Sequence, residues 1–517
     1  MNPTPAHKSY DVVIIGGAMI GSSAAFWLTR NPAFQGRVLV VERDPKYEFA
    51  STSHTNSCIR QQFGSEVNVL ISRFGAEFVH NFKAYMEDEA APDILLHSFG
   101  YLYLADTPAF AEVLRDNAAM QNRLGAATRI LTPDEIAARW PFYDLDGILC
   151  GSHNPVDEGY FDGGTIFDWF RRKAKARGVE YIHNTVTGIT REGGRVTAVT
   201  LASGETIGAG TIVNASGPRA NLTAQMAGLA IPVEPRRRFT WIFQAADPLP
   251  KDLPLTIDPS GVHMRTDGKY YMCGCPPDED PAAPFDDFSM DHHIWETKVW
   301  PAIATRVPAF EKVKVINHWV GHYAYNTLDQ NAVIGAHPEV PNFLFCNGFS
   351  GHGLQQSPAM GRGISELILH GAYQTLDLTD LGYEAYLKNL DSERNDICEY
   401  ITVTTDEDLE WCVYLGFTGP YYVEFEILCH LYTSENPHLE ANNWHMDDHL
   451  SVVTVQYDEE TGNPEYSNGF FTLEQRMKCV RDELPLASFV ENSLLLWEDE
   501  FDEFIAQLCP EIPKGDY

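Results

Sequence analysis

The chain has 517 residues, of which 44% are hydrophobic and 21% charged, as in ordinary globular proteins. This length exceeds what a single hydrophobic core usually holds and predicts two or three domains. With 37 basic and 72 acidic residues the net charge is −35, and such a surface repels phosphate backbones and anionic membranes, which excludes nucleic-acid binding by charge.

The N-terminal residues 1–8 show neither an apolar run nor an Arg-rich amphipathic pattern, so we expect a short tail and not a targeting signal. No stretch of the chain reaches the roughly 20 apolar residues of a membrane span. The ten cysteines are scattered, and the one close pair, Cys273 and Cys275, has the wrong spacing for a zinc knuckle. This usage predicts a reducing, cytoplasmic location without structural disulfides.

A strand, a Gly-rich turn, a helix and a second strand are predicted in succession near the N-terminus. The apolar run 10–15 is typical of a buried parallel strand, a helix is expected from Gly21 to about Arg30, and 37–42 forms the second strand. Glu42 ends that strand, where a carboxylate can hydrogen-bond ribose hydroxyls. The turn fits the pattern G-x-A-x-x-G with Gly16, Gly17, Ala18, Met19, Ile20 and Gly21. A helix N-terminus reached through such a turn binds pyrophosphate, so the unit predicts an NAD or FAD site; the alternative is a Gly-rich turn in another α/β protein.

Further elements of the same kind follow along the chain. We expect a helix at 163–178, a strand at 179–187, a hairpin from 195 to 206 and a buried strand at 211–215 that ends in a small-residue turn. Residues 231–320 are richer in β-type pattern, as in a separate sheet domain.

A third Gly-rich element favours FAD over NAD. A strand at 342–347 runs into the loop 348–356, and a helix with Pro358 near its first turn continues to about His370. Backbone donors at that helix N-terminus can stabilise negative charge on a reduced isoalloxazine ring, which an NAD domain does not need.

The composition becomes strongly acidic near Leu378. Residues 379–517 hold 31 acidic and 6 basic side chains but also many aromatic ones, so we predict a folded acidic α+β domain. Strands are expected at 400–405, 420–430 and 451–457, and helices at 472–484 and 493–508. This domain is expected either to bind a basic protein partner or only to pack on the core and keep the protein soluble. His445 and His449 have the spacing of a helical metal pair, but a third ligand is missing, so no metal site is predicted.

Over about residues 9–380 these features resemble the D-amino-acid-oxidase-like flavoprotein superfamily, which includes sarcosine oxidase, glycine oxidase and dimethylglycine dehydrogenase. Within it the chain is most similar to the subgroup called FAD-dependent oxidoreductase domain-containing protein 1. The matching segments are 60–63, 235–238, 323–335 and 348–357.

The resemblance implies an α/β fold in which a Rossmann-type FAD-binding domain is interleaved with a β-rich substrate domain. The FAD-binding domain is expected at 1–90, 150–230 and 316–378, and the substrate domain at 91–149 and 231–315. The resemblance also implies FAD contacts from Gly16, Gly17, Ala18, Ile20, Gly21, Glu42, Arg43, Val186, Gly217, Gly351, His352, Gly353, Leu354 and Gln355.

Three departures from sarcosine oxidase qualify what the resemblance implies. The Cys that carries covalent FAD there is replaced by Gly321 or His322, and although His54 lies near the position of a His linkage in some relatives, we expect non-covalent FAD. Met272 aligns with the Lys that activates oxygen, which favours a dehydrogenase over an oxidase and leaves the electron acceptor open. Gln355 replaces a Lys that grips the substrate carboxylate.

Arg60 matches the other carboxylate-binding residue, and a guanidinium suits bidentate carboxylate recognition. Tyr323 and His352 are the remaining polar candidates, although either could serve packing alone. The expected reaction is hydride transfer from the carbon beside a neutral amine to flavin N5, followed by hydrolysis of the imine, on a small amine or an N-substituted or D-amino acid. The alternative is a flavoprotein that acts as an assembly scaffold through its acidic domain.

Overall fold

The computed structural model describes residues 3–385 and, beyond them, five strands within 400–468. The chain divides into two compact units, Met1–Tyr386 and Leu387–Tyr517. The break follows the compositional shift at Leu378 by a few residues, because Leu378 and Tyr383 both pack into hydrophobic clusters of the first unit.

A mostly parallel sheet forms the centre of the first unit. Its main strands are β1 (Ser9–Ile15), β2 (Val38–Glu42), β8 (Glu180–His183), β11 (Thr206–Asn214), β17 (Val333–His337) and β18 (Val340–Asn347). They lie in the order β17-β18-β11-β1-β2-β8, and all but β17 are parallel to their neighbours. The strands predicted at 10–15, 37–42, 211–215 and 342–347 are therefore confirmed. The carboxyl ends of β11, β1 and β2 meet at one edge of the sheet, which is where doubly wound folds bind ligands.

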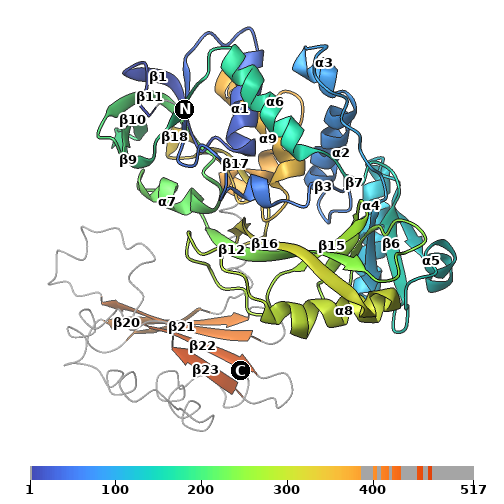
Figure 1. Ribbon diagram of the computed structural model, residues 1–517. Helices are drawn as coiled ribbons and strands as arrows, with labels where there is room; N and C mark the ends of the chain where they lie inside the picture. The colour runs from blue at the N-terminus through green and yellow to red at the C-terminus, as the bar shows by residue number, and fades with distance from the viewer. Residues whose placement is uncertain are drawn as a thin grey trace. The chain divides into compact units, whose positions relative to one another are not determined.

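Helices cover one face of this sheet. They are α1 (Met19–Arg30), α2 (Glu66–His80), α3 (Phe82–Met86), α6 (Gly163–Ala176) and α9 (Gly353–His370). Figure 1 shows α1, α6 and α9 grouped beside strands β1, β11 and β18. Val12 and Ile14 of β1 pack into this helical layer, whereas Val13 and Ile15 pack into a second cluster on the opposite face. Residues 12–15 of β1 are all apolar because both faces of the strand are buried there.

A hairpin and a short helix cover the opposite face. They are β9 (Val186–Glu192), β10 (Arg195–Leu201) and α7 (Ala220–Gln225). The single strand predicted at 179–187 is in fact β8 and the start of β9. The chain leaves the parallel sheet at Asn184, whose amide nitrogen Nδ2 donates to Ser203 Oγ at 2.6 Å, and it then pairs with β10.

The helix α9 begins earlier than predicted, so Pro358 is an internal residue and not part of the first turn. Proline has no N–H to give the carbonyl of Leu354. Ser357 Oγ donates to that carbonyl instead, at 2.9 Å, which satisfies the acceptor that Pro358 leaves open.

A mixed sheet of eight strands forms the second layer of the first unit. Its strands are β4 (Tyr101–Ala105), β5 (Arg129–Leu131), β6 (Cys150–Asn154), β12 (Val233–Ala245), β13 (Leu255–Ile257), β14 (His263–Asp267), β15 (Tyr270–Cys275) and β16 (Val313–Asn326). They lie in the order β16-β12-β15-β14-β13-β4-β6-β5. This sheet therefore includes β6 and most of β16, which lie in the ranges 150–230 and 316–378 that the sequence assigned to the FAD-binding domain. The assignment of ranges to cofactor and substrate domains stays a prediction.

The two faces of the second sheet differ in character. One face packs with α8 (Trp300–Arg306) into an apolar cluster that contains Leu102, Leu104, Cys273 and Cys275. The two cysteines are thus a buried strand pair, with free thiols.

Because side chains alternate along a strand, the intervening residues point to the other face. These are mainly polar or aromatic and include Tyr101, Tyr103, Arg238, Arg265, Met272 and Tyr323.

Shorter elements join and flank the two sheets. They are β3 (Cys58–Ile59), which pairs with β7 (Gly159–Tyr160), and the helices α4 (Pro108–Arg123) and α5 (Pro133–Arg139). The pairing of β3 with β7 brings the segment after residue 56 alongside the polar face of the second sheet.

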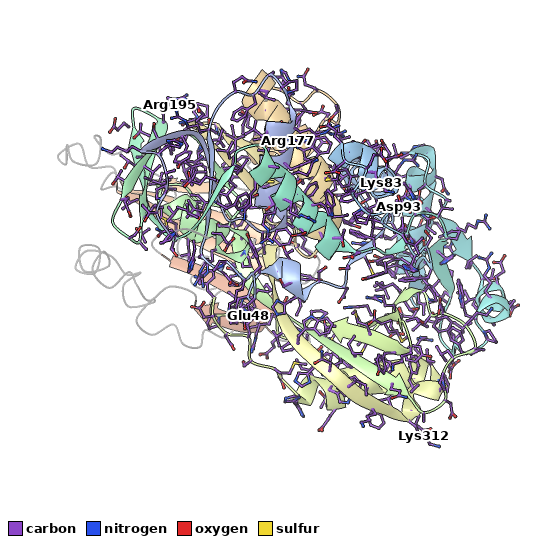
Figure 2. All side chains as sticks on the ribbon, turned by 45° about the horizontal axis from the view of Figure 1, so that its top comes forward. Glu48, Lys83, Asp93, Arg177, Arg195 and Lys312 are labelled. Atoms are coloured by element: carbon purple, nitrogen blue, oxygen red, sulfur yellow. The ribbon has the colours of Figure 1, made fainter. Side chains whose placement is uncertain are left out.

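Ion pairs stand at the rim of the first unit, such as Lys83 and Asp93, 3.2 Å apart with the carboxylate 88% exposed (Figure 2). Exposed pairs of this kind contribute little to stability. In the part of the chain that the structure describes, no helix is both long enough and apolar enough to cross a bilayer.

The second unit contains an antiparallel sheet whose five strands lie in chain order. They are β19 (Tyr400–Thr404), β20 (Leu409–Phe417), β21 (Tyr422–Leu431), β22 (Ser451–Tyr457) and β23 (Pro464–Asn468). The strands predicted at 400–405, 420–430 and 451–457 are confirmed, whereas β20 and β23 were not predicted. The predicted helices at 472–484 and 493–508 and the pair His445 and His449 lie outside the described residues.

Candidate functional site

The turn after β1 leaves no room for side chains at its first and last glycines. Gly16 has a φ of +96°, and a Cβ there would collide with the carbonyl oxygen of Ala215. A Cβ at Gly21 would collide with the carbonyl oxygen of Gly16. The pattern G-x-A-x-x-G is therefore required by backbone packing between β1, α1 and the end of β11.

The N-terminus of α1 offers unpaired donors beside this turn. Its N-cap residue Ala18 provides no side-chain cap, and the first turn contains no acidic residue. The amide of Met19 donates to Thr52 Oγ1 at 3.3 Å, while those of Ile20 and Gly21 have no acceptor within residues 3–385. Free N–H groups at a helix N-terminus are the donors that a pyrophosphate requires.

Glu42 lies at the carboxyl end of β2 and is only 6% exposed. Its Oε2 accepts from the amide of Gly17 and its Oε1 from that of Asp44, both at 2.7 Å. Burial raises the pKa of the Glu42 carboxyl, and these two amides oppose that rise. The carboxylate braces the glycine turn and retains lone pairs for ribose hydroxyls.

The remaining predicted cofactor residues lie at different distances from this edge. Val186 is buried in the same cluster as Ile15 and Val41. Gly217 has a φ of +59°, and a Cβ there would meet no atom within 4 Å. Arg43 points toward the exposed Asp286, at 3.8 Å, so its guanidinium is held at the rim.

The N-terminus of α9 lies against both the first helix and the second sheet. Ser23 Oγ of α1 donates to the carbonyl of Ser357 at 2.6 Å. Gly351 lies under the ring of Tyr323, so that a Cβ would collide with the ring carbons. The predicted Gly351, Gly353 and Leu354 thus sit where the two layers meet; Leu354 covers Gly163.

Arg60 is the centre of a polar cluster between the layers. Its Nη1 donates to the carbonyl of Gln62 at 3.2 Å and to the hydroxyl of Tyr103, and its Nη2 donates to His352 Nε2 at 2.7 Å. The guanidinium carbon also lies 4.2 Å from the ring centroid of Phe63. All of these partners are neutral, and Nε–H and one Nη2 proton of Arg60 have no acceptor within residues 3–385.

His352 is neutral over the physiological pH range. Burial and the charge of Arg60 lower the pKa of its imidazole to about 3. A neutral imidazole can accept a hydrogen bond from Arg60, whereas an imidazolium could not. His352 therefore orients Arg60 without adding charge to the cluster.

Gln355 is 4% exposed, and its Oε1 accepts from the backbone amide of Arg60 at 2.8 Å. The sequence placed Gln355 beside a substrate carboxylate, but in the structure its acceptor oxygen is used to hold the Arg60 backbone. Arg60, His352 and Gln355 do come together, and Tyr323 lies beside them over Gly351.

Two members of this cluster were not recognised in the sequence. Tyr103 could have been found from the alternation Tyr101-Leu102-Tyr103-Leu104, which places both tyrosines on one face of a strand. Glu158 gave no signal, since an acidic residue between Asp157 and Gly159 is typical of a solvated turn. In the structure its side chain is fully buried, and burial raises the pKa of its carboxyl to about 7.

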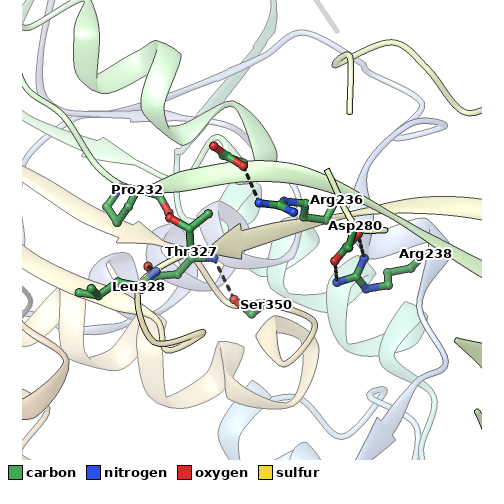
Figure 3. A network of polar contacts seen from close by, with 9 residues as sticks. Pro232, Arg236, Arg238, Asp280, Thr327, Leu328 and Ser350 are labelled. Atoms are coloured by element: carbon green, nitrogen blue, oxygen red, sulfur yellow. Dashed lines mark hydrogen bonds and ion pairs between the residues drawn. The ribbon is translucent and has the colours of Figure 1, made fainter. Parts of the chain in front are cut away.

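Other arginines on the polar face of the second sheet are neutralised by carboxylates. Arg238 forms a bidentate pair with Asp280, at 2.8 and 2.7 Å, and Arg236 donates to Glu234 at 2.9 Å (Figure 3). Arg265 donates to Asp267 Oδ1 at 2.8 Å. Arg60 differs from all three because no carboxylate contacts its guanidinium among the described residues.

The positions considered for covalent attachment of a flavin lie close together. A Cβ at Gly321 would lie 2.6 Å from Cβ of His54. The ring of His322 stacks on Phe288 with centroids 4.2 Å apart, and its Nε2 is 2.7 Å from the carbonyl of Asp287. Phe288 also stacks on His54, at 6.0 Å. Both histidines are thus engaged in packing.

Met272 is 6% exposed and pairs directly with Arg265 on β14 and Ile242 on β12. Residues paired directly across two strands share a face. The cation nearest in register is therefore Arg265, whose charge Asp267 already balances.

Comparison with known proteins identifies a family. The family described as FAD dependent oxidoreductase (DAO) matches residues 11–367. The chain is 36% identical over 411 residues to the FAD-dependent oxidoreductase domain-containing protein 1 of Xenopus laevis, which covers 73% of this chain and 82% of that protein. It is 25% identical over 404 residues to the mitochondrial dimethylglycine dehydrogenase of Rattus norvegicus, covering 73% of this chain and 45% of that protein. The crystal structure of L-proline dehydrogenase from P. horikoshii has a TM-score of 0.65 and 26% identity, covering 74% of this chain and 98% of that one.

Proposed function

The chain belongs to the DAO family of FAD-dependent oxidoreductases, and on that basis we propose that it oxidises the C–N bond of a small amine or an N-substituted or D-amino acid. The observation that carries the proposal is the guanidinium of Arg60, which has only neutral partners and retains free N–H groups. A half-buried cation whose hydrogen-bond partners are all neutral attracts a carboxylate, so the favoured substrates carry one.

The residues at the carboxyl edge of the first sheet fit FAD. The pyrophosphate would be held by the free amides of Ile20 and Gly21 at the N-terminus of α1, and a ribose by Glu42. The segment from Gly351 to Gln355 would hold the ring system against the polar face of the second sheet. When bound, FAD supplies the acceptor for a hydride, at N5.

The protein's own residues orient the substrate and exclude water. Arg60 binds the carboxylate and so directs the C–H bond beside the nitrogen toward the interface between the layers. That bond gives up a hydride, the nitrogen and carbon form an imine, and water then splits the imine into an amine and a carbonyl compound. Tyr103, Tyr323 and Phe63 wall the cluster and lower its polarity.

We propose that FAD is bound non-covalently. In support, His322 and His54 are occupied by stacking on Phe288, and Gly321 offers no side chain. Acid precipitation of the pure protein should release all of the flavin into the supernatant. Flavin that remains with the precipitate, with a matching peptide mass, would contradict this proposal.

A dehydrogenase is favoured over an oxidase, because Met272 stands where the resemblance to sarcosine oxidase places an oxygen-activating Lys. The acceptor would be a quinone, a protein or, less efficiently, oxygen. The free thiols of Cys58, Cys150 and Cys346 support a reducing compartment, and we propose the cytoplasm.

Anaerobic reduction of the flavin tests the proposal directly. The protein is mixed with N-methyl amino acids, cyclic amino acids, D-amino acids and polyamines in turn, and loss of the visible flavin absorbance is followed. We expect carboxylated amines to bleach the flavin, and their carboxamides to do so much less. If no amine bleaches it, the enzyme proposal fails, and a flavoprotein that serves as an assembly scaffold through residues 379–517 becomes the better explanation.

A further inference from the structure

We infer that Glu158 is a positioning residue: its buried carboxylate holds the segment 60–62 against β4 so that Arg60 presents its free N–H groups to an anionic substrate. This inference rests on the proposed function, because it assigns to Glu158 the orientation of the residue that binds the carboxylate.

The carboxylate of Glu158 is fully buried and has four hydrogen-bond donors. Oε1 accepts from the backbone amide of Gln61 at 2.6 Å and from Asn154 Nδ2 at 3.1 Å. Oε2 accepts from Gln62 Nε2 at 2.9 Å and from the backbone amide of Tyr101 at 3.3 Å. One carboxylate therefore joins the segment after β3 to β4 and β6 of the second sheet.

These contacts surround Arg60 without touching its side chain. Gln61 follows Arg60 directly, and the carbonyl of Gln62 accepts from Arg60 Nη1 at 3.2 Å. On the other side, Tyr101 lies two residues before Tyr103, whose hydroxyl accepts from the same Nη1. Glu158 thus fixes the distance between the two acceptors that orient the guanidinium.

The four donors explain why a carboxylate stands at this position. Burying an acid costs free energy, and a carboxylate is the one side chain that can accept all four of these donors through two oxygens. An amide at the same position has one acceptor oxygen, and its NH2 group would face the donors of Gln61 or Gln62. The Glu158→Gln variant therefore keeps the volume but breaks the junction on one side.

The test uses the flavin-loaded protein and measures binding of benzoate and of benzamide, its neutral counterpart, by titration calorimetry and by the shift of the flavin absorbance. We expect Glu158→Gln to raise the dissociation constant of benzoate about 5- to 20-fold and to leave that of benzamide within about twofold. Arg60→Ala should raise the benzoate constant about 100-fold. The double variant should bind benzoate as Arg60→Ala does, because Glu158 acts through Arg60.

Glu366→Gln is the matched control. This carboxylate is also buried and accepts from the amide of Gln374 at 2.7 Å and from Thr375 Oγ1 at 2.6 Å, away from Arg60. The Glu366→Gln variant should lower the melting temperature about as much as Glu158→Gln does and leave benzoate binding unchanged. If Glu158→Gln fails to fold, Gln62→Met removes one of the four donors and should raise the benzoate constant about two- to fivefold.

The outcomes separate the two proposals. Weaker benzoate binding in Arg60→Ala together with unchanged binding in Glu158→Gln, or an equal loss for benzamide, overturns the role of Glu158 alone. Unchanged benzoate binding in Arg60→Ala, or no benzoate binding to the wild type, removes Arg60 from the site and Glu158 with it.

Discussion

The glycine turn after β1 and the segment around Arg60 are the two halves of the candidate site, and they are built on different principles. The turn is specified mainly by neighbours in sequence: the carbonyl of Gly16 excludes a side chain at Gly21, and Glu42 closes the turn from the next strand, although the contact that excludes a side chain at Gly16 comes from Ala215. The segment 60–62 is specified by residues far away in the chain, namely Tyr103, Glu158 and His352.

The difference shows how each half recognises its ligand. The turn offers backbone N–H groups, so its chemistry survives most side-chain changes and fails when the backbone is displaced. The Arg60 segment offers one charged side chain, so its chemistry depends on a few hydrogen bonds that individual substitutions can remove. Substitutions in the two halves should therefore have distinct signatures.

The largest effect, a loss of bound flavin, is expected from a substitution in the glycine turn. Gly21→Ala places a methyl group against the carbonyl of Gly16, and α1 can relieve that contact only by moving away from the pyrophosphate site. We expect purified Gly21→Ala to contain less than about a tenth of the wild-type flavin, as measured by absorbance per protein. Gly188→Ala is the control, since its new Cβ would lie 3.6 Å from the nearest atom. Normal flavin content in Gly21→Ala would contradict the assignment.

Arg60→Ala should leave flavin content unchanged and impair only carboxylated substrates. We expect KM for such substrates to rise about 10- to 100-fold, with little change for their carboxamides. Steady-state or anaerobic half-reaction kinetics on both members of a substrate pair provide the measurement. Arg129→Ala, on the exposed edge strand β5, serves as the control. Equal losses for acid and amide would show that Arg60 acts in packing.

A smaller effect, on the rate at which oxygen reoxidises the flavin, is expected from Met272 on the second sheet. Met272→Lys places a cation on the polar face beside Arg265, and we expect reoxidation of the reduced flavin by oxygen to accelerate about tenfold. The rate is followed in a stopped-flow instrument after anaerobic reduction. Met272→Leu keeps the position apolar and should behave as the wild type. No acceleration in Met272→Lys would remove the support that this position gives to a dehydrogenase.

The smallest effect concerns pH and His352. Its pKa falls from 6.5 to about 3 on folding, so the unfolded chain binds a proton more readily and stability is lost as the pH falls from about 6.5 toward 3. Part of the acid sensitivity of the wild type should therefore be absent in His352→Gln. Denaturant unfolding at pH 7.5 and pH 5 measures this contribution. If the free energy of unfolding falls by the same amount between pH 7.5 and pH 5 in both proteins, His352 is not buried as a neutral base.

Much of the fold follows from the sequence. The inner parts of strands β1 and β18, residues 12–15 and 343–346, are apolar at every position because both faces of the parallel sheet are covered, and such runs are recognisable without a structure. The division of 179–187 into β8 and the start of β9 was not predictable, since the chain turns at Asn184 to pair with β10, a choice that depends on Ser203.

The candidate site was predictable only in part. Arg60, His352 and Gln355 were named from the resemblance, yet Gln355 holds the backbone of Arg60 where a role at the substrate was expected. Glu158 was not predicted, because the adjacent sequence does not distinguish a buried acidic residue from a solvent-exposed one. Its burial is decided by β4 and β6, which approach it from other parts of the chain.

The sequence by itself determined the dinucleotide turn, because the glycine spacing between a strand and a helix is a local pattern, and the clash that excludes a side chain at Gly21 comes from Gly16, five positions away. Only the tertiary structure decided which arginine is free to bind an anion. Nothing in the local sequence distinguishes Arg60 from Arg238. Folding brings Asp280 to Arg238 but brings only neutral hydrogen-bond partners to Arg60. An ion pair between residues 42 positions apart depends on packing and not on a local sequence pattern.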